Sequence, residues 1–218
     1  MKKKLLISLT LFLLLSTYKT QKSFLITRFN IAKIEVVNNS ILSKEDIKKD
    51  LLFLYEKNLF FLNTLDIEKI LIKKSFIESF SIKKIYPNKV KIKIFEKKPI
   101  AVLHMKKKKF FISKNIELIN YLDLEIFQNL PNVFGNKNDF KKFYVNLNKI
   151  NFPVEIIKNY YLYQSGRWDI EIYENKIVKL PSKNYIKSLK NFINLDKEKN
   201  FDKYKIIDYR INNQLILK

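Results

Sequence analysis

The sequence predicts an α+β protein with an N-terminal membrane anchor, a compact β-α-α-β-β unit and a second, strand-rich domain with two helices. Three observations lead to this prediction. Residues 5–18 are mostly apolar. Residues 29–102 change from a strand-like to a helix-like spacing of apolar residues and back again. Residues 103–218 contain several short apolar runs between turn residues, and two segments with helical periodicity.

Composition indicates a folded protein and weakens the case for a polyanionic partner. The chain has 218 residues, of which 47% are hydrophobic and 14% aromatic. Its formal charge of +22 would ordinarily indicate nucleic acid or an anionic surface. However, only Arg28, Arg167 and Arg210 are arginines, and arginine is the usual ligand of bases and phosphates. Glycine and alanine are scarce while lysine, isoleucine and asparagine abound, so codon bias in an A/T-rich genome accounts for much of the lysine excess.

Residues with catalytic or metal-binding chemistry are almost absent from the sequence. There is no cysteine, which excludes disulfides and thiolate metal sites. The single histidine, His104, has no Ser/Asp constellation around it, so we expect a packed or solvated side chain. We therefore expect no enzyme, no cofactor, no metal and no small-molecule substrate.

The N-terminal segment has the features of a signal sequence or a membrane anchor. After three lysines, an apolar run extends from Leu5 to Leu15 and could continue to Tyr18. At about 1.5 Å per residue the run spans roughly 21 Å, which is short of the ~30 Å hydrocarbon core and typical of a signal peptide. The following STYKTQKS offers no small-x-small cleavage site, which favours an uncleaved signal-anchor. We expect a cytoplasmic tail over 1–4, a membrane span over 5–18 and a linker over 19–28.

The first folded unit begins with a strand and two helices. FNIAKIEVVNN alternates like a strand and ends in a turn. Ser43 is placed to cap a helix whose buried stripe we expect to comprise Ile47, Leu51, Leu54 and Tyr55. A second helix is predicted to begin at Asn63 or Thr64, with Ile67, Ile70 and Leu71 facing inward.

The unit closes with a hairpin whose strands cover about 77–86 and 89–97. Pro87 fits the turn because it fixes φ and donates no hydrogen bond. Ile82 and Ile85 are out of phase, which predicts a bulge at Lys83-Lys84. Because two helices cover only one face of the sheet, we expect the lysines at positions 89, 91 and 93 to line its solvent face.

The ordered motifs of this unit resemble the POTRA domain of the bacterial cell-division protein family FtsQ (DivIB). The matching blocks are Ile34-Glu-Val-Val-Asn-Asn, Asn58-Leu59-Phe60, Phe76-Ile77, Lys84-Ile85-Tyr86-Pro87 and Glu96-Lys97-Lys98-Pro99-Ile100-Ala101. Asn39 stands where many family members have glycine, and asparagine tolerates a positive φ. The resemblance implies a POTRA domain over 29–102.

The second domain is predicted to contain a hairpin, a helix, three strands, a helix and a terminal hairpin. We expect a solvated turn or a sheet edge at 105–109, a turn at Ser113–Asn115 and a loop over 130–135. The first helix has Phe140, Phe143, Tyr144 and Leu147 on one side. Turns at Gly166 and Glu174-Asn175 separate the three strands. Ser182 is expected to cap the last helix, which carries Ile186, Leu189 and Ile193, and the terminal hairpin turns at Asn212-Asn213.

These blocks are also similar to the second, β domain of the FtsQ family, which implies such a domain over 103–218. The matching pieces are Phe111–Asn115, Leu130-Pro131 with Gly135, Trp168–Ile170 with Lys176–Leu180, and Ile207–Arg210. We expect Trp168 to lie in the core. Asp208 and Arg210 are two residues apart on a strand, so they share a face and we expect them to pair.

The most informative candidate site is the last strand, because QLILK leaves an expected sheet edge whose backbone groups could pair with a partner strand. In FtsQ-like proteins this edge is where the small bitopic division proteins FtsB and FtsL dock. The resemblance therefore implies partner binding by Ile211, Asn213, Gln214, Leu215 and Ile216. It also implies a non-enzymatic divisome scaffold, single-pass in the inner membrane at the division septum, with its N-terminus in the cytoplasm and its domains in the periplasm.

Two other functions remain open from the sequence. A POTRA-containing secretion or outer-membrane assembly chaperone would show repeated POTRA units or a following β-barrel. A basic anionic-lipid or nucleic-acid binding protein would show arginine and aromatic residues clustered on one face. A hydrolase is more remote, because no nucleophile–base pair can be nominated.

Overall fold

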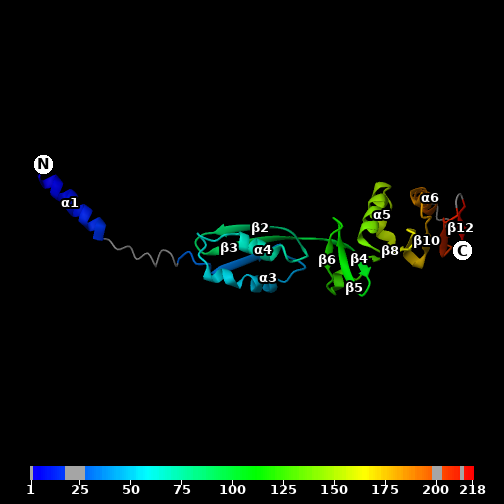
Figure 1. Cartoon of the computed structure of the whole chain (residues 1–218), viewed down its shortest axis with the longest axis horizontal. Coiled ribbons are helices and arrows are strands. Elements are labelled where there is room, and N and C mark those ends of the chain that lie inside the picture. The colour runs from blue at the N-terminus through cyan, green and yellow to red at the C-terminus, as the bar shows by residue number, and fades with distance from the viewer. Residues whose placement is uncertain (1, 18–27, 198–202, 212–213) are drawn as a thin grey trace. The chain divides into compact units, whose positions relative to one another are not determined.

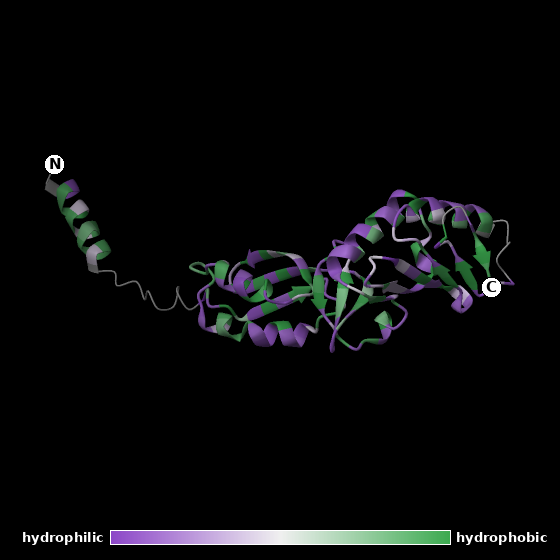
Figure 2. Ribbon diagram, turned by 45° about the vertical axis from the view of Figure 1, so that its right-hand side comes forward, coloured by the Kyte–Doolittle hydropathy of each residue, from purple (hydrophilic) through white to green (hydrophobic). Residues whose placement is uncertain are grey.

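The computed structural model describes residues 2–17, 28–197, 203–211 and 214–218. The chain forms two compact units, Met1–Glu96 and Lys97–Lys218. Helix α1 (Lys2–Thr17) begins the first unit, and Figure 2 shows it largely in the hydrophobic colour. Over the described ranges, no helix combines the length and apolar character needed to cross a membrane. Tyr18 and the predicted linker 19–28 lie almost wholly outside the described residues.

The remainder of the first unit is a three-stranded sheet with two helices and a 3₁₀ turn (Figure 1). The sheet order is β1-β3-β2, with β1 parallel and β2 antiparallel to β3. The elements are β1 (Lys33–Val37), α3 (Lys44–Asp50), η1 (Leu52–Glu56), α4 (Leu65–Leu71), β2 (Ile77–Ile85) and β3 (Lys89–Glu96). This is the β-α-α-β-β order that the sequence predicts.

One face of this sheet packs against the helices. Alternate residues of β1 and β3 are buried, and they share a single core with residues of α3, η1 and α4. The fully or nearly buried members include Ile34, Val36, Val90, Ile92, Ile94, Ile47, Leu51, Leu54, Ile67 and Leu71. The apolar residues that repeat every two positions in the strands and about every 3.6 positions in the helices therefore form one hydrophobic layer.

The opposite face carries the alternating lysines, as the sequence predicts. Glu35 lies between Lys89 and Lys91 and forms an ion pair with each. These two contacts lower the pKa of Glu35, with the hydrogen bond from Lys89 contributing most.

Two local predictions for this unit are wrong. Tyr55 is 40% exposed, because the chain beyond Asp50 tightens into the 3₁₀ turn η1 and the helical stripe does not continue. The register of β2 with β3 is regular through Lys83 and shifts instead between Ile77 and Ser79.

A positive φ occurs at Asn38, directly before the Asn39 that stands where many family members have glycine. Asn38 has a φ of 65°, and its side-chain amide donates to the carbonyl of Ile94 at 2.7 Å. That long-range hydrogen bond ties the end of β1 to β3.

The second unit is built on a nine-stranded sheet with the order β12-β11-β10-β9-β8-β7-β4-β5-β6. Its strands are β4 (Pro99–Met105), β5 (Lys108–Ser113), β6 (Leu118–Asn120), β7 (Asn132–Phe134), β8 (Ile157–Leu162), β9 (Trp168–Ile172), β10 (Ile177–Lys179), β11 (Ile206–Asp208) and β12 (Ile216–Leu217). The helices are α5 (Lys137–Lys149) and α6 (Tyr185–Lys197), with short 3₁₀ turns η2 (Glu125–Phe127), η3 (Val154–Ile156) and η4 (Tyr173–Asn175).

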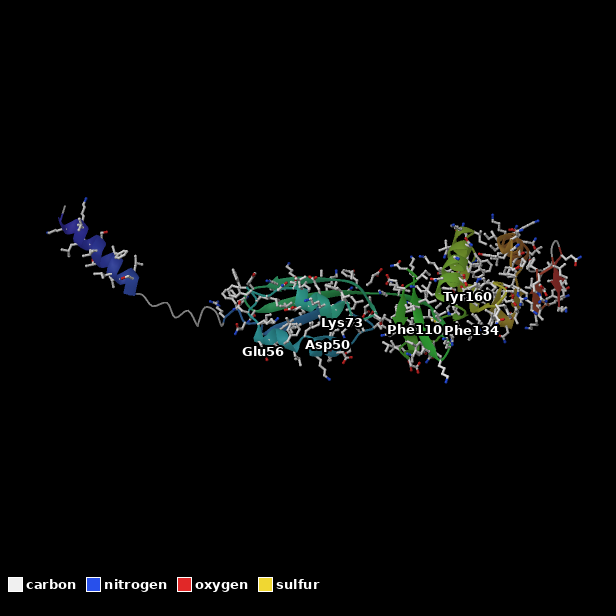
Figure 3. The ribbon with its side chains drawn as sticks, in the orientation of Figure 1. Asp50, Glu56, Lys73, Phe110, Phe134 and Tyr160 are labelled. Atoms are coloured by element: carbon white, nitrogen blue, oxygen red, sulfur yellow. The ribbon has the colours of Figure 1, made fainter. Side chains whose placement is uncertain are left out.

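Helices α5 and α6 cover one face of this sheet, and both lie on the same side in Figure 1. Trp168 is only 5% exposed and stacks on Phe143 with ring centroids 4.9 Å apart, so the core role predicted for it is confirmed. Figure 3 labels Tyr160, whose ring meets Phe140 of α5 edge-on at 5.2 Å. Burial raises the pKa of the Tyr160 hydroxyl.

The other face carries a chain of hydrogen bonds that crosses four strands. The chain runs from His104 to Asn132 (2.8 Å), from Asn132 to Asn159 (3.0 Å) and from Asn159 to Glu171 (2.8 Å). Each amide donates through Nδ2 toward Glu171, so Oδ1 of Asn132 is left as the acceptor that faces Nε2 of His104. The histidine is thus part of a structural network.

Two predictions for the second unit are wrong. The stretch 130–135 is not simply a loop, because it contains β7, which pairs in parallel with β4 and β8 near the middle of the sheet. A three-residue strand is too short to show alternation in the sequence. Helix α6 begins at Tyr185, so Ser182 does not cap it.

Candidate partner-binding edge

Strand β12 lies at the end of the nine-stranded sheet and pairs with β11 on one side. Ile206 and Lys218 exchange two backbone hydrogen bonds, at 2.9 and 3.0 Å. In an antiparallel pair, bonded and non-bonded positions alternate, and Leu217 stands opposite Ile207 at a non-bonded position. The N–H and C=O of Leu217 therefore point away from β11, toward the position of a further strand.

The residues that the resemblance implies for partner binding fall on and before this edge. Ile211 is 51% exposed, and Gln214 is exposed. Leu215 and Ile216 are half-buried. Asn213 and the predicted turn Asn212-Asn213 lie outside the described residues.

The side chains of the last strand divide between the two faces of the sheet. Leu215 and Leu217 pack against the core beneath α5 and α6. Ile216 pairs in register with Asp208 and so shares the open face with it. A strand added beyond β12 would extend both faces.

Two ion pairs lie on the open face near the edge, and in each of them an arginine binds an aspartate two residues away in the chain. Asp208 accepts from Arg210, with Nη2 and Oδ2 2.6 Å apart, which confirms the pairing that the sequence predicts. Arg167 pairs with Asp169, with Nε and Oδ1 3.1 Å apart. In register, Lys179 lies between the two aspartates on β10.

The two aspartates differ in their proton affinity. The hydrogen bond from Arg210 lowers the pKa of Asp208. Burial raises the pKa of Asp169, and the charge of Arg167 opposes that rise only in part. Asp208 is therefore the more firmly ionised group beside the edge.

A hollow of about 1020 Å³ adjoins the edge on the helix side. The start of α6, Tyr209, Ile211 and Leu215 contribute to its walls. Its geometry is held by hydrogen bonds from Asn146 to the Tyr185 hydroxyl (2.7 Å) and from the Tyr209 hydroxyl to Asn191 (2.9 Å). A side chain from an added segment could enter this hollow.

Sequence reasoning identified the edge and the Asp208–Arg210 pair but missed the other elements. The Arg167–Asp169 pair shows the same two-residue spacing and could have been found by the same argument. The hollow could not, because residues far apart in the chain form it. Across the part of the chain that the structure describes, no group of three histidine, aspartate or glutamate side chains could hold a metal ion.

Residues 29–97 match the family model described as "POTRA domain, FtsQ-type". The match covers the three-stranded sheet and its helices.

The chain is also similar to curated proteins named cell division protein FtsQ. It is 29% identical to that of Rickettsia bellii (strain RML369-C) over 168 residues, which cover 72% of this chain and 60% of the relative. It is 27% identical to that of Rickettsia typhi (strain ATCC VR-144 / Wilmington) over 161 residues, with the same coverages of 72% and 60%. The chain thus spans about 60% of the length of these relatives.

Among solved structures, the chain resembles the major extracytoplasmic domain of the cell division protein DivIB from Geobacillus stearothermophilus. The alignment covers 49% of this chain and 98% of that one, at 11% identity and a TM-score of 0.34. A TM-score this low does not establish a shared fold.

Proposed function

Because the chain belongs to the FtsQ family, whose curated relatives carry the name cell division protein, we propose that it is a non-enzymatic scaffold of the bacterial division machinery. It recruits and links other division proteins while the septum forms. The FtsQ-type POTRA match, the relatives and the lack of a nucleophile–base pair in the sequence support this role.

The proposed topology places one helix in the inner membrane and the folded domains in the periplasm. The apolar character of α1 supports an anchor at this place in the chain. The proposed parts are a cytoplasmic tail (1–4), a membrane span (5–18), a linker (19–28), the POTRA domain (29–102) and the β domain (103–218).

The observation that carries the proposed function is the edge at β12. A partner strand laid beside it would pair with the outward N–H and C=O of Leu217, so main-chain hydrogen bonds would supply affinity. We propose that the partner is a small bitopic division protein of the FtsB or FtsL kind. Ile211, Asn213, Gln214, Leu215 and Ile216 would carry the contact, with the ion-paired face and the hollow beside β12 supplying selectivity.

The test compares Leu217→Pro with Leu217→Ala in the full chain. Proline removes the outward N–H, whereas the bonds to β11 come from neighbouring positions. Alanine truncates the same side chain but keeps the N–H, so it controls for lost packing. We expect proline to weaken binding of the FtsB- and FtsL-like proteins from the same organism about tenfold or more relative to alanine, which equals about 1.4 kcal/mol.

Deletion of residues 213–218 is a stronger test, because it removes the whole of strand β12. It should abolish binding in a pull-down. Hydrogen exchange of β8 and β9, which lie inside the sheet, checks that the domain remains folded. If the deleted chain binds its partners as well as the full chain, strand addition at this edge is wrong.

A further inference from the structure

Four aromatic side chains gather at one end of the POTRA domain. Phe29, Phe60 and Tyr86 form a triangle with ring centroids 6.2 to 6.4 Å apart, and Phe61 lies 5.5 Å from Phe60. We call these four residues the aromatic cluster. Phe60, Phe61 and Tyr86 are 63%, 76% and 54% exposed. Single exposed apolar residues are ordinary, but a contiguous aromatic group marks a contact surface.

The core of the domain does not explain this cluster. In the run Asn58–Asn63, Leu59 and Leu62 are 0% and 5% exposed and belong to the core, whereas the two phenylalanines between them point outward. The segment is also held in place. Leu59 donates its N–H to the carbonyl of Phe29 at 2.7 Å, and Lys84 Nζ donates to the carbonyl of Leu62 at 2.7 Å. A held backbone thus presents these rings to the outside.

Positive charge lies beside the rings. Arg28 is exposed and directly precedes Phe29, and the Lys84 ammonium lies 3.5 Å from the carbonyl oxygen of Phe60. Lys89 begins β3 just after Tyr86 and pairs in register with Lys33. On the open sheet face near this end, Lys33, Lys83, Lys89, Lys91 and Lys93 occupy registered positions around Glu35.

Codon bias does not explain this distribution. A bias toward lysine codons would raise the lysine content everywhere, but it would not by itself gather five lysines around a single glutamate on adjacent strands. The helices of the same domain alternate acidic and basic residues, with Glu45, Asp46 and Asp50 set among the lysines of α3. The charge of the open face is therefore a local property.

We propose that the aromatic cluster docks the POTRA domain onto the surface of the membrane, with its rings in the interfacial region and the adjacent lysines near anionic headgroups. The inference rests on the proposed membrane anchor. Phe29 follows the proposed ten-residue linker (19–28), a length of chain that can reach at most about 36 Å. A span over 5–18 would therefore keep the cluster close to the bilayer at a high effective concentration.

The composition favours lipid over a protein partner. Insertion of aromatic rings into the headgroup region of a membrane is favourable, and basic side chains next to the rings are attracted to anionic lipids. Lysine supplies a point charge without the planar fork by which arginine recognises defined carboxylates and phosphates. Apolar and cationic contacts of this kind suit a fluid surface.

The experiment uses the natural absence of cysteine. A single cysteine is introduced by Phe61→Cys or, as the matched control, by Ile72→Cys, and labelled with the environment-sensitive dye NBD. The two positions are 76% and 71% exposed. Ile72 precedes β2 and Tyr86 follows it, so the nine residues of β2, about 30 Å, separate the two ends. The full chain is reconstituted into vesicles of phosphatidylcholine and phosphatidylglycerol.

The proposal predicts a blue-shifted NBD emission at position 61 and dithionite reduction several-fold slower than at position 72. Replacing Phe60 by serine, or using phosphatidylcholine alone, should reduce this protection. Equal dithionite rates at 61 and 72 in chains that float with the vesicles would overturn the inference while leaving the anchor intact, and would point to a protein partner for the rings. Failure of the chain to float would overturn both the inference and the proposed anchor.

Discussion

At the scale of single residues, Glu96 shows how one side chain stabilises a loop. Its carboxylate accepts hydrogen bonds from the N–H groups of Ser40 (2.8 Å), Ile41 (2.9 Å) and Leu42 (2.7 Å), and from the Ser40 hydroxyl (2.7 Å). The loop after β1 is thereby tied to the end of β3. The glutamate of the Glu-Lys-Lys-Pro-Ile-Ala block thus has a structural role that the sequence motif does not reveal.

Replacement of Glu96 should therefore destabilise the POTRA domain. Glu96→Gln keeps the shape but removes the charge and turns one acceptor oxygen into a donor, so we expect a loss of about 1–3 kcal/mol in the free energy of unfolding. Glu56→Gln, which removes the same charge from an exposed side chain, is the control. Denaturant unfolding followed by circular dichroism measures both. Equal stability of the two variants would contradict this account of Glu96.

The same contacts predict an acid dependence. Burial raises the pKa of Glu96, but the hydrogen bonds from Leu42, Ser40 and Ile41 outweigh that effect and hold the pKa below 4.5. A lowered pKa in the folded state contributes stability above pH 4.5 that is lost as the pH falls through the folded value. The wild type should thus lose more stability than Glu96→Gln between neutral pH and pH values below 4.5.

At the scale of elements, the β7–α5 junction depends on a close approach of the chain to its neighbours. A Cβ on Gly135 would lie 2.9 Å from Cβ of Leu162 and 3.3 Å from the ring of Trp168. Asn136 then caps α5 by accepting from the N–H of Asp139 at 3.0 Å. Glycine at this position lets β7 and the helix start pack directly against β8 and β9.

We therefore expect Gly135→Ala to destabilise the β domain by about 1–3 kcal/mol. The Cβ of Leu162 is bonded directly to its own backbone, so it cannot rotate away from the new methyl group. Gly166→Ala is the control, because it introduces the strain of alanine at a positive φ without a steric clash. Gly166 has a φ of 75° with no atom near the new Cβ, so alanine there costs only conformational strain, about 1 kcal/mol. Thermal unfolding of both variants tests the prediction, which fails if Gly135→Ala is the milder change.

At the scale of the whole molecule, the two units have separate hydrophobic cores. Ile92 lies in the core of the first unit and Ile170 in that of the second, and the two clusters share no residue. Each core is closed by its own helices.

A cavity in one core should consequently leave the other intact. Ile92→Ala and Ile170→Ala should each cost about 2–5 kcal/mol in the unit that contains them. Amide hydrogen exchange read by mass spectrometry can follow β3 and β9 in the same sample. Faster exchange in the mutated unit alone is the expected result, and equal acceleration in both units would show that they unfold together.

The sequence predicted most of the secondary structure, for a physical reason. Strands and helices with one buried face reveal their period, as in β3 and α5, and turn residues such as Gly166 stand where a positive φ is needed. The errors fall where this signal is weak. Strand β7 is too short to alternate, and η1 changes its pitch within a run that reads as one helix.

The sequence by itself determined the α+β class, the order of elements, the family resemblance and the position of the terminal strand, because these depend on local periodicity and ordered motifs. Only the tertiary structure decided which backbone groups of β12 point outward, which residues form the hollow beside it, and that four rings from three separate segments meet at one end of the POTRA domain. Such features arise where residues far apart in the chain come into contact, and a local sequence pattern does not show which distant segments will meet.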